Sequence, residues 1–210
     1  MRIDIVSDVV CPWCIIGYKQ LEHALAETGT DADIHWHPFE LNPHMDEAGE
    51  NLREHLAAKY GTTLEDSIRA RARLTGLGEE LGFAFNYTDD MRMHNTFRAH
   101  QLLHWAEQFD LTHKLKLALF EAFFTRREDV SDPDVLSAVA EGVGLDGDKA
   151  KSVLESAEFA NAVREEEQLW ISRGISGVPA MVFIGEALVT GAQGVENYKR
   201  VIQHFSTRAA

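Results

Sequence analysis

The sequence predicts an α/β fold with a large all-helical insertion, and two observations carry this prediction. Strand patterns occur only towards the two ends of the chain, at residues 2–7, 32–37, 181–184 and 187–190. Between about residues 42 and 174 the apolar periodicity is that of helices alone. We therefore expect an α/β unit formed by residues 1–41 and 175–210, divided in the sequence by a helical insertion of residues 42–174.

Composition and charge exclude several classes of protein. The 210 residues are 45% hydrophobic and 26% charged, which suits a globular chain with a sizeable core. A net charge of −14 opposes binding to nucleic-acid phosphates or to an anionic membrane surface. The first residues show no secretory signal, and no apolar run approaches the roughly 20 residues of a membrane-spanning helix. We expect a cytoplasmic protein that binds neither nucleic acid nor membranes.

The N-terminal pattern is strand, helix, strand. Residues 2–7 alternate polar and apolar side chains and are rich in β-branched residues, which predicts a strand. Pro12 suits the first position of a helix, because its missing N–H would have no partner there, and this makes Cys11 the N-cap. The helix ends at Thr28-Gly29, and a second strand runs to Pro38. This connection normally gives parallel strands.

The helical region divides at capping residues. Thr63, with Asp66 three positions later, is typical of a capping arrangement for a helix that runs towards Gly82. Asp132-Pro133 supplies an N-cap and a first-position proline for another helix. Further helices are expected at residues 93–109, 112–126, 146–156 and 158–173.

After Gly174 the pattern returns to strands. Two short strands surround Gly185-Glu186, a two-residue Gly-X hairpin signal, and a last helix is expected at residues 195–205. Val178-Pro179 stands just before the first of these strands. Because Pro179 has no N–H, the backbone of Val178 is free to pair with an incoming segment. If their peptide bond is cis, as about 5–6% of X–Pro bonds are, that backbone would face the thiols.

Cys11 and Cys14 are the only cysteines, and their Cys-Pro-Trp-Cys motif is the most informative local feature. A helix N-terminus favours a thiolate through its free N–H groups and positive dipole end. As N-cap, Cys11 would accept from the N–H of Trp13 or Cys14, at a place that is poor for burial and good for reactivity. Cys14 falls on the buried stripe of the helix. We therefore expect Cys11 to exchange with a partner sulfur and Cys14 to resolve the mixed disulfide.

Further residues are candidates for substrate contacts. Trp36 and Phe39 surround the end of the second strand, where sheets of this kind place ligands, so they line a substrate groove or form core at the seam with the insertion. Asn95 and His100 share one expected helix and are candidates for polar contacts over the thiols. The expected substrate-binding set is completed by the neighbours of the thiols, namely Pro12, Trp13 and Val178.

The order of these motifs resembles the DsbA superfamily of thioredoxin-fold proteins, in particular its cytosolic FrnE-like branch. The matching segments cover nearly the whole chain: Ser7-Asp8-Val9-Val10-Cys11-Pro12-Trp13-Cys14, Pro38-Phe39-Glu40-Leu41-Asn42-Pro43, Asn95-Thr96-Phe97-Arg98-Ala99-His100, Gly177-Val178-Pro179-Ala180 and Val189-Thr190-Gly191-Ala192-Gln193.

The resemblance implies a thioredoxin-like domain with a mixed β-sheet. It implies that Cys11 is the nucleophile, Cys14 the resolving thiol and Pro179 a cis proline that faces them. It further implies disulfide exchange with protein or low-molecular-weight thiols through a redox-active Cys11–Cys14 disulfide, with no metal or organic cofactor and with glutathione as a candidate co-substrate. Trp13 replaces the histidine of periplasmic DsbA, which favours a reductase or isomerase over a strong oxidase.

Two alternatives stay open. The layout also resembles hydroxychromene-carboxylate isomerases and kappa-class glutathione transferases, which are glutathione-dependent but characteristically carry serine where Cys11 stands. The second alternative is a zinc-stabilised binding or chaperone module, in which Cys11 and Cys14 bind the metal together with His100 and His104. Apolar clusters at residues 102–103 and 115–124 would suit a homodimer if part of them is exposed.

Overall fold

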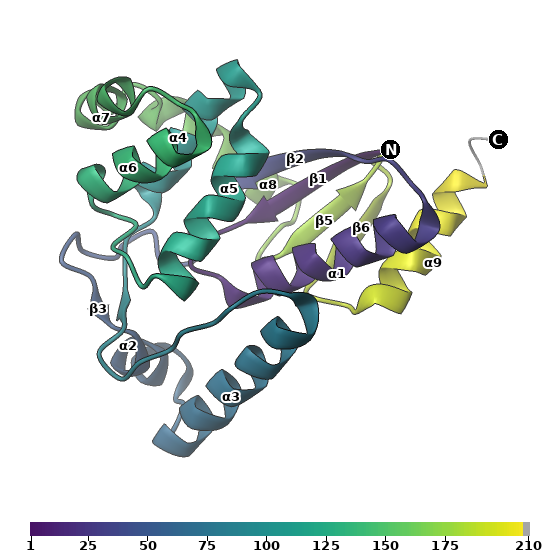
Figure 1. The fold of residues 1–210 in the computed structure, drawn as a ribbon, viewed down its shortest axis with the longest axis horizontal. Helices are drawn as coiled ribbons and strands as arrows, with labels where there is room; N and C mark the ends of the chain where they lie inside the picture. Colours follow the sequence, from purple (N-terminus) through teal and green to yellow (C-terminus); the bar gives the residue numbers. More distant parts are fainter. Residues whose placement is uncertain (208–210) are drawn as a thin grey trace.

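The computed structural model describes residues 1–207 and has an α/β fold built on a four-stranded mixed sheet (Figure 1). Its strands are β1 (Arg2–Ser7), β2 (Asp33–Pro38), β5 (Ala180–Phe183) and β6 (Ala187–Thr190), in the spatial order β2-β1-β5-β6. β1 pairs with β2 in parallel, as the strand-helix-strand pattern predicts. The pairs β1–β5 and β5–β6 are antiparallel, so both ends of the chain build one sheet.

Two helices cover one face of the sheet. α1 (Pro12–Thr28) and α9 (Val195–Ser206) lie side by side there (Figure 1). Ile3 and Ile5 of β1 are fully buried in the same core as Ile202 of α9. At Gly17 of α1, an added Cβ would lie only 3.2 Å from the ring of Pro179. The missing side chain therefore lets α1 approach the segment that precedes β5.

α8 (Ala160–Ser172) lies behind the sheet and packs against β2 (Figure 1). Val6 and Ala180 of the sheet form a second core with Trp170 of α8 and with Ile175. Beyond Arg2, β1 is therefore buried on both faces, and its polar residues Asp4 and Ser7 are buried with it. The alternation of polar and apolar residues that predicts β1 therefore does not correspond to one buried face and one solvent-exposed face.

The region expected to be helical contains eight further helical segments within the described residues. They are α2 (Leu52–Tyr60), α3 (Leu64–Leu81), α4 (Phe97–Ala106) with the 3₁₀ turn η1 (Glu107–Phe109), α5 (Thr112–Phe120) with the π-helical η2 (Glu121–Thr125), α6 (Pro133–Val143) and α7 (Gly147–Ser156). Thr63 and Asp66 form the predicted capping box of α3. Asp132 caps α6, and Pro133 is its first residue, as predicted.

The structure corrects two sequence predictions. The region expected to be entirely helical contains a small antiparallel pair, β3 (Glu50–Asn51) and β4 (Arg92–Met93). Each strand has two residues, which is too short for an alternation pattern to reveal it. Secondly, the hairpin turn centres on Ile184 and Gly185, both with positive φ, rather than on Gly185-Glu186. The Glu186 N–H donates to Phe183 O at 2.9 Å, which is the type I′ arrangement.

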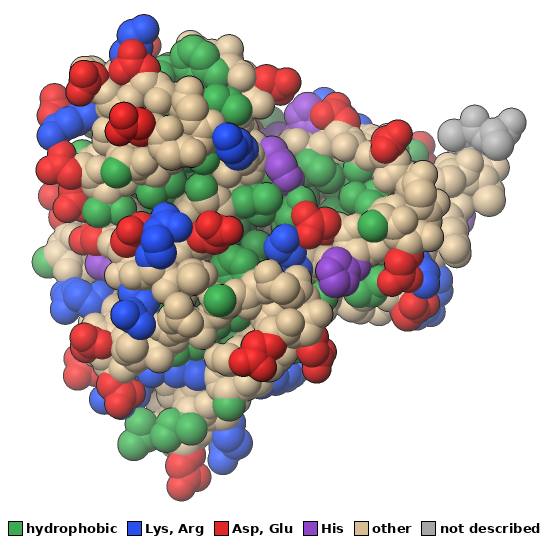
Figure 2. All heavy atoms as spheres, in the orientation of Figure 1, with side chains coloured by type: hydrophobic (Ala, Val, Ile, Leu, Met, Phe, Trp, Pro, Cys, Tyr) green, Lys and Arg blue, Asp and Glu red, His purple; other side chains and the backbone are tan. Residues whose placement is uncertain are grey.

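The surface agrees with the charge balance of the sequence. On the face shown in Figure 2, acidic and basic side chains are interspersed, without a broad basic area. Within residues 1–207, no helix is both long enough and apolar enough to cross a bilayer.

Candidate active site

Cys11 and Cys14 lie at the start of α1, directly after β1. Cys11 is the N-cap and Pro12 the first helical residue, as predicted, and both cysteines are free thiols. The expected hydrogen bond to the Cys11 sulfur from the first turn is not formed within the described residues. Instead, the Cys14 N–H donates to the Cys11 carbonyl oxygen at 3.1 Å. The Cys11 thiol points towards Val178 O, 3.8 Å away.

Cys11 is more buried than its place in the helix predicts. Its exposed fraction is 3%, and Cys14 is fully buried, so the expectation that the N-cap is poor for burial is wrong. The reason is tertiary, because the insertion closes over the start of α1. Arg73 of α3 stacks on the Trp13 ring, with 5.3 Å from the guanidinium carbon to the ring centroid. Tyr87 lies near enough to Cys11 for their charges to interact, and burial raises the pKa of its phenol.

The Gly-Val-Pro segment from the far end of the sequence meets the thiols. The Val178–Pro179 peptide bond is cis. Pro179 is buried against α1 at Gly17, and the carbonyl of half-buried Val178 is the group that faces Cys11. The structure therefore brings together residues that the sequence separates by more than 160 positions.

A buried polar network lies next to the thiols. Asp8, His100 and Lys116 are exposed by 0%, 2% and 1%. Asp8 Oδ1 lies 3.3 Å from His100 Nε2, and Asp8 Oδ2 accepts the N–H of Leu41 at 2.7 Å. Lys116 Nζ donates to Ser7 O at 3.3 Å. Asp8 and Ser7 lie at the end of β1, whereas His100 and Lys116 come from α4 and α5 of the insertion.

Burial and mutual attraction set the charges of this network. Burial lowers the pKa of Lys116 to about 8, although the thiols and Asp8 oppose this. Burial, reinforced by Cys11, raises the pKa of Cys14 well above its ordinary value, and Lys116 acts against that rise. Burial also opposes ionisation of Asp8, but the hydrogen bond and charge of His100 outweigh it and lower the Asp8 pKa. A buried ammonium group therefore interacts with the Cys14 thiol and opposes the rise of its pKa.

Sequence analysis missed the functional candidates Asp8 and Lys116. The signal for Lys116 is its place on an apolar helix face, because Phe120 and Phe123 follow it at helical spacing. Asp8 interrupts a mostly apolar stretch, residues 5–10, before the cysteines. A lone charge on a buried face requires a partner, but the sequence does not say which one.

The other candidate residues lie in structural positions. Trp36 is 5% exposed, and its Nε1 donates to His113 Nδ1 at 3.0 Å. Phe39 packs against the second core, behind the sheet. The Asn95 amide donates to Met45 O at 2.9 Å and thereby holds a loop, while His100 reaches the thiols only through Asp8. Trp36 and Phe39 thus occupy the core alternative that the sequence left open, and their contact with a substrate stays a prediction.

An apolar cavity of about 120 Å³ adjoins the cysteine motif. Val10 and Pro12 form one wall, and the insertion forms the others, mainly through Leu52, Leu56, Ala70, Leu74, Tyr87, Met93, Phe123 and Phe124. Ala70 of α3 is exposed, so it marks the rim of this cavity. Concave, mostly apolar sites of this kind suit an apolar side chain.

The cysteines do not take part in a metal-binding cluster within residues 1–207. In that part of the chain, the side chains that lie close enough together to hold an ion are those of His104, Glu107 and Glu166. The four-ligand zinc site expected for the binding-module alternative is therefore not assembled, because His104 turns towards Glu166 and His100 towards Asp8.

A family model and a solved structure identify the family of this chain. The model for DSBA-like thioredoxin domains matches residues 2–203. The crystal structure of a probable DsbA oxidoreductase from Streptomyces coelicolor is 31% identical, with a TM-score of 0.91 over 97% of this chain and 89% of that one. The uncharacterized protein YwbO of Bacillus subtilis is 28% identical over 96% of both chains. A cytosolic disulfide reductase of Pseudomonas aeruginosa, DsbM with GSH, shares the fold at 16% identity and a TM-score of 0.66, over 99% of this chain and 100% of that one.

Proposed function

This chain belongs to the family of DSBA-like thioredoxin domains, and on that premise we propose that it is a cytosolic dithiol–disulfide oxidoreductase. The observation that carries the proposal is the pair of free thiols at the start of α1, with the Cys11 sulfur 3.8 Å from Val178 O. Its proposed substrates are disulfides of proteins or of small thiols such as glutathione. The similarity in fold to a protein named as a cytosolic disulfide reductase supports both the compartment and the reductive direction.

In the proposed reaction, Cys11 begins the exchange. Its thiolate attacks one sulfur of the substrate disulfide, so that the substrate S–S bond breaks and a mixed disulfide with Cys11 forms. The Cys14 thiolate then attacks the Cys11 sulfur, releases the second substrate thiol and closes a Cys11–Cys14 disulfide. The substrate gains two electrons and two protons, and glutathione or another small thiol restores the dithiol.

Lys116 has a proposed role in the second step. Cys14 is fully buried and holds its proton strongly, so its thiolate needs a compensating positive charge. Lys116 is the buried cation that acts on it, and Asp8 and the Ser7 carbonyl hold this ammonium near the end of β1. We therefore expect Lys116 to act as a positioning residue for charge rather than as a group that touches the substrate.

The proposed binding surface for a protein client has two parts. The Val178 backbone offers hydrogen bonds to an extended segment, a mode that gives affinity without sequence specificity. The apolar cavity beside Pro12 then selects a client with an apolar side chain near its cysteine.

Exchange with a peptide disulfide and with oxidised glutathione tests this proposal. Cys11→Ser should abolish both reactions. Cys14→Ser should stop turnover but accumulate a mixed disulfide, visible by mass spectrometry and lost on reduction. The exposed α7 variant Ser152→Ala serves as the control and should match the unmodified protein. Activity that survives Cys11→Ser unchanged would exclude the mechanism.

A redox titration separates this proposal from the glutathione-dependent isomerase or transferase class. Equilibration with glutathione buffers should convert two thiols per chain into one intramolecular disulfide. Tight glutathione binding without this two-electron couple would instead favour the isomerase or transferase reaction.

A further inference from the structure

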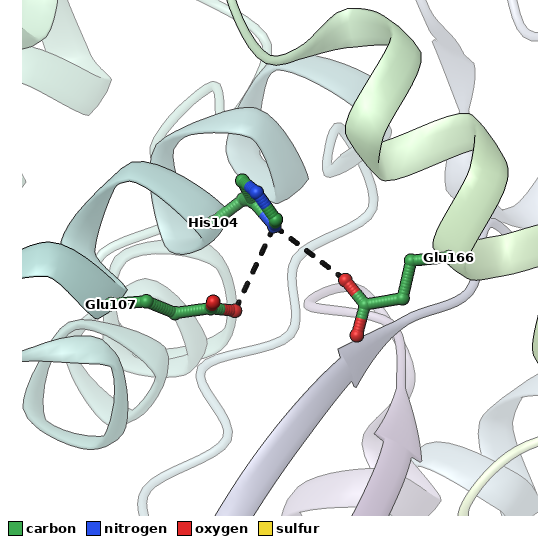
Figure 3. A group of neighbouring side chains, drawn as sticks. All are labelled: His104, Glu107 and Glu166. Atoms are coloured by element: carbon green, nitrogen blue, oxygen red, sulfur yellow. Dashed lines mark ion pairs between the residues drawn. The ribbon is translucent and has the colours of Figure 1, made fainter.

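A histidine and two glutamates converge where α4 and η1 meet α8, within the insertion (Figure 3). His104 belongs to α4, Glu107 to η1 and Glu166 to α8. His104 Nδ1 lies 3.7 Å from Glu107 Oε1 and 3.6 Å from Glu166 Oε2, both too long for hydrogen bonds. Within the described residues this shielded nitrogen has no hydrogen-bond partner, so a buried ring nitrogen lies in the gap between two carboxylates.

The spacing of these three atoms suits a small divalent cation. All three ligand atoms lie within 4.8 Å of one another. Ligands at 2.0–2.2 Å from a tetrahedral metal stand about 3.4 Å apart, close to the two distances from His104. A modest movement of one glutamate would complete the set. Two carboxylates also balance the charge of a divalent ion, and an imidazole among the ligands selects zinc and similar transition metals over calcium or magnesium.

A neighbouring histidine, His37, holds the Glu166 carboxylate in place. His37 of β2 lies 2.6 Å from Glu166 Oε1 through its Nδ1, which leaves Oε2 to face His104. The other nitrogen of His37 lies 2.8 Å from Asp4 Oδ1. Such outer partners orient the ligands of protein metal sites. An open pocket of about 400 Å³ also reaches Glu107 and Glu166 and gives an ion a path to the cluster.

We propose that His104, Glu107 and Glu166 bind a divalent transition-metal cation, with zinc the best match to their ligand types. The ion would take one or two waters as its remaining ligands. It would join α4 and η1 to α8 and, through His37, to the edge strand β2. This site is separate from the two thiols, and its effect would be to fix the insertion against the sheet.

Metal titration of the full chain tests the site. The cysteines are first alkylated or closed into their disulfide, because a free dithiol binds the same metals. Calorimetry with Zn²⁺ should then show one ion per chain. Co²⁺ should give ligand-field bands without the charge-transfer band of a thiolate ligand. Absence of stoichiometric binding to the blocked protein would overturn the proposal and leave the cluster as an ion-pair network only.

Single substitutions identify the ligands. Zn²⁺ binding should weaken at least tenfold in each of His104→Ala, Glu107→Gln and Glu166→Gln, whereas the exposed α7 variant Glu155→Gln should bind Zn²⁺ like the unmodified protein.

Glu107→Gln is the substitution least expected to disturb folding, because half of the Glu107 side chain is exposed. Zn²⁺ should raise the midpoint of thermal unfolding of the unmodified protein but not of Glu107→Gln. Equal Zn²⁺ affinity in all these variants would place the ion elsewhere and contradict the proposal. These measurements require no thiol activity, so their outcome does not depend on the proposed oxidoreductase function.

Discussion

The two sides of the thiol pair have opposite chemistry. On one side, α2 and α3 enclose an apolar cavity against Val10 and Pro12. On the other, Asp8, His100 and Lys116 form a network of charges with almost no exposure. The insertion contributes to both sides, whereas the thiols belong to the sheet unit. Under the proposed function, the insertion would determine which clients bind and how readily the thiols ionise, while the exchange itself would take place at the start of α1.

The largest effect is expected from the charged side. Lys116→Met keeps the length of the side chain but removes the buried cation, so thiolate formation should become harder. At an effective dielectric constant near 20, removing one charge a few ångströms away changes the free energy of ionisation by a few kcal/mol. The rate of thiol alkylation at neutral pH should therefore fall on the order of 100-fold. Stopped-flow alkylation measures the effect: the curve of alkylation rate against pH should be displaced to higher pH.

Lys116→Arg is the matched control for that loss. It keeps the positive charge, so its alkylation profile should stay closer to that of the unmodified protein than the profile of Lys116→Met does. Coincident profiles for Lys116→Met and the unmodified protein would show that the ammonium has no electrostatic role.

A second group of charges, around Glu166 of α8 and away from the thiols, predicts sensitivity to acid. Burial opposes ionisation of Glu166, but His104 and His37 outweigh it and lower the Glu166 pKa to about 2, from an ordinary value of 4.5. The stability that this carboxylate contributes is therefore present above pH 4.5 and is lost as the pH falls from there towards 2. Glu166→Gln should reduce the free energy of unfolding by about 2 kcal/mol near pH 6, and the difference should vanish near pH 2. Urea unfolding across this range measures it. A constant difference at every pH would contradict the assignment.

The apolar side is tested at its rim. Ala70→Trp should block the cavity and raise KM for a peptide disulfide with an apolar neighbour about three- to tenfold, the range that one to two buried methylenes account for. The rate with oxidised glutathione should not change. Ile68→Trp is the matched control, because Ile68 is exposed on the same helix and lies outside the cavity. Equal KM values for the two tryptophan variants would exclude the cavity as a client site.

The smallest effect is expected from removing the N-cap of α2. Asn51 caps this helix by accepting the N–H groups of Arg53 and Glu54. Asn51→Ala should lower the free energy of unfolding by about 1 kcal/mol, the usual loss for such a cap. The pH profile of thiol alkylation should not move, because no member of the charged network lies on α2. A displaced profile would show that the two sides are coupled.

Local signals in the sequence predict most of the fold. Pro12 after Cys11 places the start of α1, and the Thr63–Asp66 pair places the start of α3, because the partners in each case are a few residues apart. The start of α4 is predicted four residues too early. There β4 and the Asn95 side chain, which accepts the Phe97 N–H, delay the helix.

The environment of the site could be predicted only in part. The sequence identifies Cys11, Cys14 and Pro179 through their motifs. It does not predict that Cys11 is buried, because that burial comes from the packing of the insertion and not from the first turn of α1. Likewise, Lys116 and Ser7 are 109 positions apart, and their contact exists only once α5 packs near the end of β1.

The pairing of β1 with β5 also has a consequence for the order in which the protein is synthesised and folded. The thiols lie near the beginning of the chain, whereas Val178, Pro179 and β5 are made near its end. At 5–20 residues per second, a ribosome needs roughly 10 to 30 seconds to make the intervening segment. During this interval the nascent chain carries a free dithiol that lacks its neighbouring strand and its Val178 carbonyl. A growing chain of this protein is therefore most open to oxidation before its own sheet is complete.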